Sequence, residues 1–465
     1  MSTIRAEIRE GEYGDRVLAV EPGGAELIPL SERHGRPLQL FWTWMSPNLE
    51  FATIFLGVLA VAAFGLSFWQ AVLAIVLGTG LGSLTHGLLS SRAPSFGVPQ
   101  MILSRISFGR IGNLLPAGLN AVTASMGWFA VNSVSGAFAL SALTNLPRVP
   151  SLIIVVAVQI AVAFFGHNMI HVFERYAFPL LAVIFIIASV IIVSKSEPGS
   201  VSGKGGIGGF LIAVGVSFGY AAGWNPYAAD YARYLPPTTS RQATAAWAGL
   251  GVFVSCVILE VVGAASVTIP GKVSSNPTEA FTGHLPSVVA NLTLLAIALG
   301  AVAANVINIY SGAMSFLALG IKLPLALRRA IVAAAAGTVG FVIALYGLDH
   351  VDTYEQFLLI IAYWIGPWLG VYLTDWYLRR SYRVDGFLFD RAHNPWAGPL
   401  AMLIAIAISI WLFANQVKYV GVVPKHYPQF GDIAFEVGFV LAALLYAAFF
   451  MAQKDRKSEA LVLPD

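Results

Sequence analysis

The stretch TWMSPNLEF, residues 43–51, interrupts an apolar run of about Leu40–Gly65 with Ser46-Pro47-Asn48. A second apolar run, about Gly206–Ala228, is interrupted by Gly223-Trp224-Asn225-Pro226. An unwound segment inside a membrane leaves costly unpaired backbone groups unless a cavity or a ligand satisfies them. Paired interruptions in corresponding halves of a chain are typical of the substrate site of a secondary transporter.

The composition is that of an integral membrane protein. The 465 residues are 57% hydrophobic and only 11% charged, whereas about a quarter of an average soluble chain is charged. Twelve apolar stretches approach the roughly 20 residues that span a bilayer. They cover approximately residues 40–65, 68–89, 112–142, 151–166, 176–194, 206–228, 243–267, 287–319, 329–346, 354–373, 396–415 and 433–452.

The positive charges predict the orientation. If the N-terminus is cytoplasmic and twelve spans alternate, the outside keeps six basic side chains, namely Arg148, Lys195, Lys204, Lys272, Lys418 and Lys425. The other 21 of the 27 Lys and Arg then lie in the cytoplasm, as the positive-inside rule requires. We therefore expect a multi-pass protein of the plasma or inner membrane with both termini cytoplasmic. The basic loops need no nucleic-acid partner.

The spans divide into two related sets. Residues 39–195 and 205–375 each hold five spans, and each set opens with an interrupted one. An odd number of spans gives the two sets opposite topologies. The sequence thus predicts an all-α membrane protein with a five-plus-five inverted repeat and about 12 transmembrane helices, the last two appended in residues 396–452.

Polar segments flank this transporter domain of residues 39–452. Residues 1–38 are expected to form a flexible cytoplasmic tail, and residues 453–465 a second tail. The one cysteine, Cys256, excludes an internal disulfide. The sequence shows no metal-spaced His/Cys cluster, nucleophile elbow or phosphate-binding loop, so we expect neither an enzyme nor a bound metal or cofactor.

Side chains near the interruptions are candidates for a binding site, with Ser46 and Asn48 at the first break. Ser125, Trp128 and Asn132 share one helical face, because their spacings are three and four residues. Aromatic side chains flank the second break at Phe218, Tyr220 and Trp224. Amide side chains in a membrane need partners, so the pair Asn305 and Asn308, one turn apart, indicates either a substrate contact or a helix–helix tie.

Glu50 is the most informative single residue. It lies near the middle of the first span, two residues past the break. A carboxylate at that depth costs roughly 2.5–3.5 kcal/mol, so it indicates function. Glu50 can bind an N–H edge of a substrate, carry a coupling proton, or do both; the alternative is a carboxyl bonded to a neighbouring helix.

Other polar side chains are expected to have structural roles. Glu260 lies in the seventh span, where a structural role is expected ahead of a part in a proton relay, and His86 is expected to pack between helices rather than to carry a proton. Glu174 and Asp230 are expected to form surface or gate ion pairs beside Arg175 and Arg233.

Four motifs resemble one family in order and spacing. WNPYAADYARYLP at 224–236 resembles the signature of the sixth span in cytosine and purine permeases of the nucleobase–cation symporter family. GWF at 127–129, GHNMIHVFERYAFP at 166–179 and NVINIYS at 305–311 resemble three further motifs of that family. The resemblance covers roughly residues 36–450 and implies the five-plus-five fold with a nucleobase-like substrate.

The resemblance also implies roles for the candidates. A flat base needs aromatic walls, and side-chain amides suit its edge of donors and acceptors. Trp128 would form one wall. We expect Phe218 and Tyr220 to form the other in preference to Trp224, with Asn305 favoured over Asn308 for reading the edge.

The expected coupling ion follows from a difference between this chain and the sodium-coupled members of the family. Sodium-coupled members resemble one another in hydroxyl residues just before the asparagine of the eighth span, where this chain has Ala303 and Ala304. Two alanines remove two oxygen ligands, so protons are favoured over sodium, with Glu50 as the candidate carrier.

The sequence therefore predicts a proton-coupled importer of a nucleobase, of cytosine or purine type, or of a related small heterocycle. Open alternatives are a carrier of a hydantoin-, allantoin- or vitamin-like heterocycle, and an amino-acid or amine carrier of the same fold. A channel or sensor is less consistent with two broken helices. The expected partners are the small-molecule substrate and the lipid bilayer, and the oligomeric state is not predicted.

Overall fold

The computed structural model describes residues 4–9, 12–22, 24–270, 276–321, 328–350, 353–453 and 461–462. The first set of spans comprises α1 (Gln39–Met45), η2 (Ser46–Asn48), α2 (Phe51–Ala62), α3 (Phe68–Ser90), α7 (Leu114–Val122), η3 (Thr123–Trp128), α8 (Phe129–Thr144), α9 (Arg148–Phe165) and α10 (His167–Lys195). The second comprises α11 (Gly206–Ala222), η4 (Asn225–Tyr227), α12 (Ala228–Ala232), α13 (Arg241–Val267), α15 (Ser287–Ala318), α16 (Arg328–Gly347) and α17 (Tyr354–Leu378).

Short helices connect these spans, and further elements complete the chain. The connections are α4 (Ala93–Phe96), α5 (Gln100–Leu103), α6 (Arg105–Gly112) and α14 (Pro277–Thr282). The C-terminal part holds η6 (Asp385–Leu388), α18 (Ala397–Phe413), α19 (Val422–His426), η7 (Pro428–Phe430) and α20 (Ala434–Ala452). Near the ends lie η1 (Leu30–Glu32) and a parallel pair of two-residue strands, β1 (Ile4–Arg5) and β2 (Leu461–Val462).

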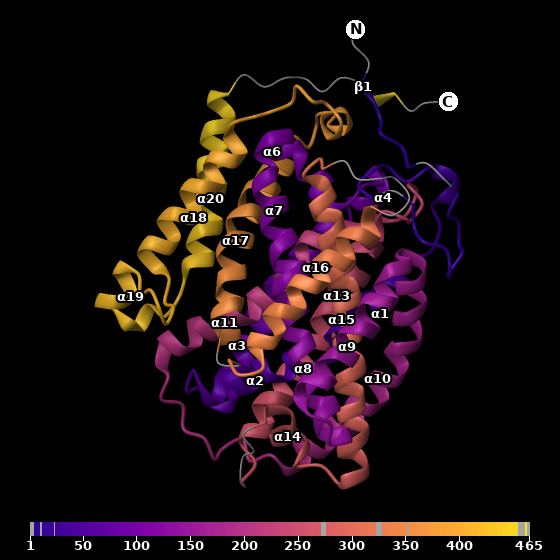
Figure 1. Ribbon diagram of the computed structural model, residues 1–465. Helices are drawn as coiled ribbons and strands as arrows, with labels where there is room; N and C mark the ends of the chain where they lie inside the picture. The colour runs from indigo at the N-terminus through magenta and orange to yellow at the C-terminus, as the bar shows by residue number, and fades with distance from the viewer. Residues whose placement is uncertain are drawn as a thin grey trace.

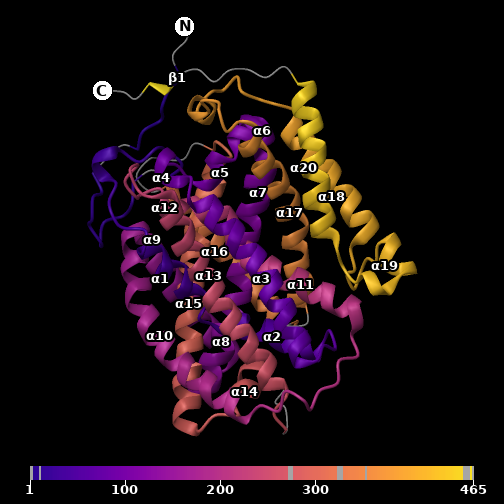
Figure 2. The same cartoon turned by 180° about the vertical axis from the view of Figure 1, so that it is seen from behind.

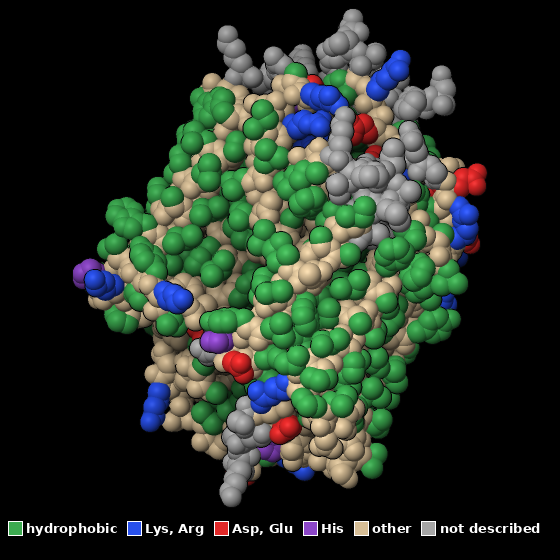
Figure 3. Space-filling model, in the orientation of Figure 1, with side chains coloured by type: hydrophobic (Ala, Val, Ile, Leu, Met, Phe, Trp, Pro, Cys, Tyr) green, Lys and Arg blue, Asp and Glu red, His purple; other side chains and the backbone are tan. Residues whose placement is uncertain are grey.

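The helices have the lengths and apolarity of membrane spans. Within the described residues, nine helices are long and apolar enough to cross a membrane, or ten if the bent pair Gln39–Asn48 and Phe51–Ala62 is one span. Each of the twelve apolar stretches expected from the sequence coincides with a helix. Figure 3 shows apolar side chains over the middle of one face, with Lys and Arg toward its two ends and its edges.

Two groups of helices pack around the centre. One group is α1, α2, α3, α11 and α13, and the other is α8, α9, α15 and α16. Figures 1 and 2 show α18 and α20 beside α17 at the edge of this bundle. The two figures also place α14 at the end opposite the chain termini. Each group takes helices from both sequence sets, as an inverted repeat requires.

Small residues let the first group pack closely. A Cβ built on Gly57 of α2 would lie 1.6 Å from the carbonyl oxygen of Glu260, and one on Gly263 of α13 would lie 1.9 Å from that of Ile54. Only glycine fits at such backbone contacts. The packing therefore fixes α2 against α13 and makes them a single unit.

The two predicted interruptions differ in form. At the first, α1 and α2 are bent by 60° across the break. At the second, a short 3-10 turn at Asn225–Tyr227 tightens the helix, and Gly206–Ala232 remains one continuous span. Pro47 and Pro226 occupy these turns, where a missing backbone N–H costs least.

The expectation of a flexible N-terminal tail is wrong for the described part of it. Tyr13, Glu21 and Ile28 are buried against the helix ends. The Glu21 backbone N–H donates to the Phe165 carbonyl (3.0 Å), and the Asn168 N–H donates to the Tyr13 hydroxyl (3.0 Å). The segment thus covers the end of the bundle that bears the termini.

Candidate functional site

The first break exposes backbone and places Glu50. Leu49 and Glu50 leave the helical conformation, with ψ of 68° at Leu49 and φ of −152° at Glu50. Glu50 therefore stands at the N-cap of α2, where the free N–H groups of a first turn favour a carboxyl group. The Thr53 hydroxyl donates to the Asn48 carbonyl at 2.7 Å, which ties the two sides of the break together.

Glu50 is fully buried and held by hydroxyl groups. Ser135 of α8 and Tyr220 of α11 each donate to its carboxyl oxygens at 3.3 Å. Among the described residues its polar neighbours are these hydroxyls and the backbone N–H groups of Phe51 and Ala52. Glu50 thus joins α2 to α8 and α11 at the centre of the bundle.

Trp128 lies across the second break. It ends the π-helical turn η3, a wider turn that interrupts the third span and is often found at functional sites. A Cβ on Gly223 would be 3.1 Å from the Trp128 indole nitrogen, so the indole packs on the backbone of the break. Its ring also meets Tyr220 edge to face, with centroids 5.4 Å apart.

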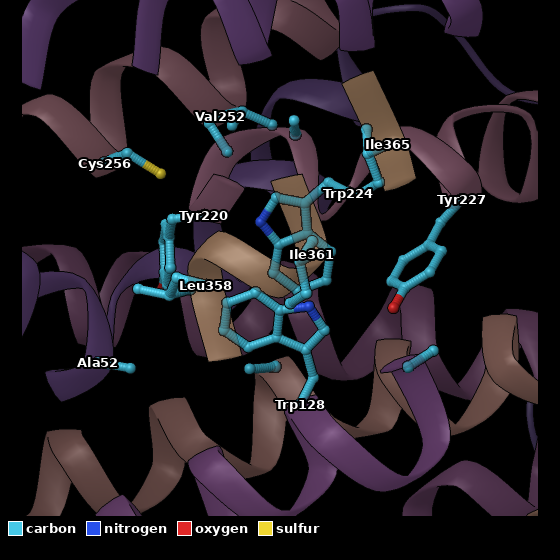
Figure 4. Close-up of a cluster of buried hydrophobic side chains, with 14 of the residues drawn as sticks. Ala52, Trp128, Tyr220, Trp224, Tyr227, Val252, Cys256, Leu358, Ile361 and Ile365 are labelled. Atoms are coloured by element: carbon cyan, nitrogen blue, oxygen red, sulfur yellow. The ribbon is translucent and has the colours of Figure 1, made fainter. Parts of the chain in front are cut away.

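Trp224 joins the two breaks directly. Its indole N–H donates to Asn48 Oδ1 at 2.9 Å, and the Asn48 amide donates to the Trp44 carbonyl at 2.7 Å. Figure 4 shows the rings of Trp128, Tyr220, Trp224 and Tyr227 gathered in this buried cluster. The side chains of both breaks and of the third span therefore form one packed aromatic cluster, which we call the chamber.

Three amides line the chamber on the side of α15. The Asn305 side-chain oxygen accepts from the amides of Asn132 (3.1 Å) and Asn308 (3.3 Å). The Asn305 amide nitrogen donates to the Phe129 carbonyl (2.8 Å) and the Ser133 hydroxyl (3.0 Å). Both of its polar atoms are occupied. Asn308 Oδ1, by contrast, is buried without a hydrogen-bond partner among the described residues. A buried acceptor without a partner is costly and indicates a ligand contact.

The structure does not bring every expected residue to the chamber. Phe218 stacks on Phe435 of α20, with centroids 4.1 Å apart and ring planes at 10°, on the side of the appended helices. Ser125 is buried against α15, since a Cβ on Gly312 would lie 1.9 Å from its hydroxyl. Ser46 lies at the break, and its buried hydroxyl lacks a hydrogen-bond partner among the described residues.

A cavity of about 190 Å³ borders the chamber on the side of α14. Its lining runs from Gly127 and Ser135 to Pro277 of α14, and Phe51 and Phe357 contribute aromatic surface. Phe357 also packs edge to face on Trp128, with centroids 5.3 Å apart. The cavity therefore connects the chamber with the end opposite the termini.

Two expectations about ion pairs are corrected. Glu174 forms no ion pair among the described residues and is fully buried, with both carboxyl oxygens lacking partners there. Asp230 is buried too and accepts from the Gln100 backbone N–H at 2.9 Å. Arg233 forms its ion pair with Glu21 of the N-terminal segment instead, at 3.2 Å.

The remaining buried groups match their expected structural roles. Glu260 accepts from the Thr79 hydroxyl at 3.1 Å, which joins α13 to α3. His86 packs edge to face on Trp44, with centroids 4.2 Å apart. Sequence reasoning did not identify Ser133 and Ser135 as partners of the site, although both lie near Asn132 in the third span.

An all-helical membrane bundle with an aromatic and amide chamber at two helix breaks is the architecture of a secondary transporter. Over residues 27–438 the chain matches the family described as permease for cytosine/purines, uracil, thiamine, allantoin, and it belongs to that family. It is therefore a membrane permease for a small heterocycle rather than an enzyme.

Known relatives agree with this assignment. A putative purine-cytosine permease of Bacillus subtilis is 30% identical over 92% of this chain and 95% of its own length. The purine-cytosine permease fcyB of Emericella nidulans is 28% identical over 92% of this chain and 88% of its own. Mhp1, a nucleobase-cation-symport-1 family transporter solved with bromovinylhydantoin bound, shares the fold with a TM-score of 0.76 at 20% identity, covering 93% of this chain and 95% of that one.

Proposed function

We propose that this chain imports a nucleobase of the cytosine or purine type together with a proton. The supporting observation is the Glu50 carboxyl, buried at the first break and bonded by the hydroxyls of Ser135 and Tyr220. A buried charge without a counter-ion is costly, so this carboxyl is stable as the protonated acid and becomes charged only when water or a partner reaches it. Such a group can bind and release one proton per transport cycle.

The chamber suits a flat heterocycle. We assign Trp128 and Trp224 as its two walls, with Tyr220 beside them. Trp224 replaces Phe218 in this role because Phe218 packs against α20. Asn308 Oδ1 is assigned to accept an N–H from the substrate edge, because Asn305 is already occupied by its neighbours. Asn48 and Asn132 supply further polar groups next to the rings.

Sodium is the competing coupling ion. One related fold belongs to a Na⁺-coupled sialic acid symporter, at a TM-score of 0.63 and 13% identity. In this chain α15 closely approaches the first break, since a Cβ on Gly300 would lie 2.3 Å from the Leu49 carbonyl oxygen. The neighbouring Ala303 and Ala304 contribute no side-chain oxygen there, which favours the proton.

The distribution of basic residues supports an orientation with both termini in the cytoplasm of the plasma or inner membrane. The α14 end would then face the outside, and the cavity beside the chamber would be the route by which substrate arrives. The helix group of α1, α2, α3, α11 and α13 would rock against the group of α8, α9, α15 and α16 to release it inside.

The test is uptake of labelled cytosine, adenine, hypoxanthine and uracil by cells that express the chain. Each base is assayed with and without sodium, and with and without a proton uncoupler. We expect one base to accumulate without sodium and to stop accumulating with the uncoupler. Sodium-dependent uptake that ignores the uncoupler would refute the coupling, and no uptake of any base would shift the substrate to a hydantoin-, allantoin- or vitamin-like compound.

A further inference from the structure

We propose that Glu174 of α10 is a second proton-binding carboxyl, which receives the coupled proton and releases it to the cytoplasm. This inference rests on the proton coupling proposed above. The inference goes beyond that coupling because it assigns a release site and a route that lie outside the chamber.

The environment of Glu174 differs from that of the other buried acids. It is fully buried on α10, beside Ser46 of the first break and near the ring of Tyr231. The Ser46 hydroxyl faces its carboxyl, and no close hydrogen bond within 3.5 Å holds either carboxyl oxygen among the described residues. Glu260, by comparison, accepts from a hydroxyl of a neighbouring helix, and Glu50 from two. Because a buried polar group without a partner is rare and costly, such a carboxyl in a membrane bundle indicates a function.

Glu50 and Glu174 lie on either side of the first break. Glu50 follows the break and is bonded toward the α14 side of the bundle, where the 190 Å³ cavity reaches Ser135. Glu174 is next to Ser46, where the break begins, on the side of the chain termini. The break is the part of the first span whose geometry must change when access alternates. The two carboxyls therefore flank the segment that moves, Glu174 at its start beside Ser46 and Glu50 at its end.

A small polar cavity continues the route to the end that bears the termini. It has a volume of about 40 Å³, enough for water. Thr43, His171 and Tyr231 line it together with His34 from the N-terminal segment. Tyr231 borders both Glu174 and this cavity, and His171 lies one helical turn before Glu174 on α10.

The proton would move in two steps. When the end that bears the termini opens, Glu174, held as the neutral acid by burial, gives its proton to the water that enters through the small cavity. The carboxylate left behind takes the proton of Glu50 through water in the opened break, and Glu50 remains charged until it is reloaded from the α14 side. The ionisable side chains along this route are Tyr231 of α12, His167 and His171 of α10, Tyr234 and His34. Arg233 acts on His167 and Arg175 on His171, and the polar group beside the Glu174 carboxyl is the Ser46 hydroxyl.

The experiment uses the purified full chain in proteoliposomes with the base that the wild type transports. Substrate-driven proton flux is followed with an internal pH dye, and substrate exchange is followed by counterflow. In Glu174→Gln we expect proton flux to fall roughly 100-fold, the low end for loss of a positioned proton-transfer group, whereas counterflow stays near wild type. Glu174→Asp keeps a carboxyl group and should restore much of the flux.

Glu260→Gln is the matched control, because it neutralises a buried acid away from the route and its amide oxygen can still accept from Thr79. Normal proton flux in Glu174→Gln would overturn the proposal. Equal loss of flux in Glu260→Gln, or loss of counterflow along with flux in Glu174→Gln, would also overturn it, since the effect would then be structural. A wild type that exchanges substrate without moving protons would instead refute the coupling of the proposed function.

Discussion

Asn305 and Asn308 carry the same side chain on the same helix, but their environments assign them different roles. The Asn305 amide is held on both of its polar atoms by residues of the third span and of α15, whereas Asn308 keeps a buried oxygen without a partner among the described residues. The sequence identified the pair. It favoured Asn305 for substrate contact, whereas the geometry leads us to propose Asn308, because one-turn spacing does not reveal which amide meets a neighbouring helix.

This difference predicts separate effects of the two alanine substitutions. Asn305→Ala removes the acceptor of the Asn132 and Asn308 side-chain amides, at about 1–3 kcal/mol for each buried group, so it should reduce the yield of folded protein. Asn308→Ala should raise KM and leave the yield nearly unchanged. Fluorescence-detected size exclusion and uptake kinetics measure the two effects. Equal loss of yield in both variants would contradict the assignment.

Trp128 offers a second test at this scale. Stacking of a base on an aromatic ring contributes roughly 1–3 kcal/mol, so Trp128→Ala should raise KM by roughly 5- to 150-fold. Trp128→Phe should keep part of the affinity. Concentration-dependent uptake, corrected for the amount of protein in the membrane, provides the comparison.

Phe218→Ala is the contrasting variant, because Phe218 packs on Phe435 rather than in the chamber. We expect it to lower stability and leave KM close to wild type. A KM increase in Phe218→Ala as large as in Trp128→Ala would restore Phe218 as a wall of the site.

Single glycines set how the spans pack. Gly57→Ala places a methyl group within 1.6 Å of the Glu260 carbonyl oxygen, so α2 and α13 must separate. Overpacking of this kind costs about 1–3 kcal/mol. Gly80→Ala is the matched control on α3, since its nearest atom, on Phe253, would be 3.7 Å away. Thermal denaturation in detergent should show a lower midpoint for Gly57→Ala alone, and equal midpoints would contradict the close approach.

The spans were largely predictable from the sequence, because apolar length is set by bilayer thickness and does not depend on contacts. The proline-containing breaks were predictable for the same local reason. The direction of Phe218 was not, since both sides of α11 are apolar and only the position of α20 decides which one Phe218 faces. The burial of Glu174 was missed because Arg175 beside it suggested an ion pair, whereas adjacent residues on a helix point in different directions.

The N-terminal segment connects the two helix groups at one end of the molecule. The Glu21 carboxyl accepts from Arg233 at 3.2 Å and from the Tyr310 hydroxyl at 3.0 Å. It also accepts from the His167 backbone N–H at 3.0 Å and from the Tyr234 hydroxyl. Arg233 follows α12, which packs on α3 of the first group, and Tyr310 belongs to α15 of the second. Opening at this end must therefore break the contacts of one buried carboxylate.

Glu21→Gln should loosen this end. The reporter is a single cysteine, introduced by Thr43→Cys in a background with Cys256→Ala. In inside-out vesicles we expect it to react faster with a membrane-impermeant maleimide when Glu21→Gln is present than when Glu21 is kept. Glu12→Gln is the control, because Glu12 is exposed on the same segment. An unchanged labelling rate in Glu21→Gln would show that the segment does not hold the end closed.

The buried carboxylate at position 21 lies outside the part of the chain that matches the family, residues 27–438. What the permease recognises and how readily it opens are thus encoded in separate stretches of the gene. Substitutions in a short leading segment can change the equilibrium between the inward-facing and outward-facing states of the carrier. Two permeases with the same chamber can then differ in transport rate while they select the same compound.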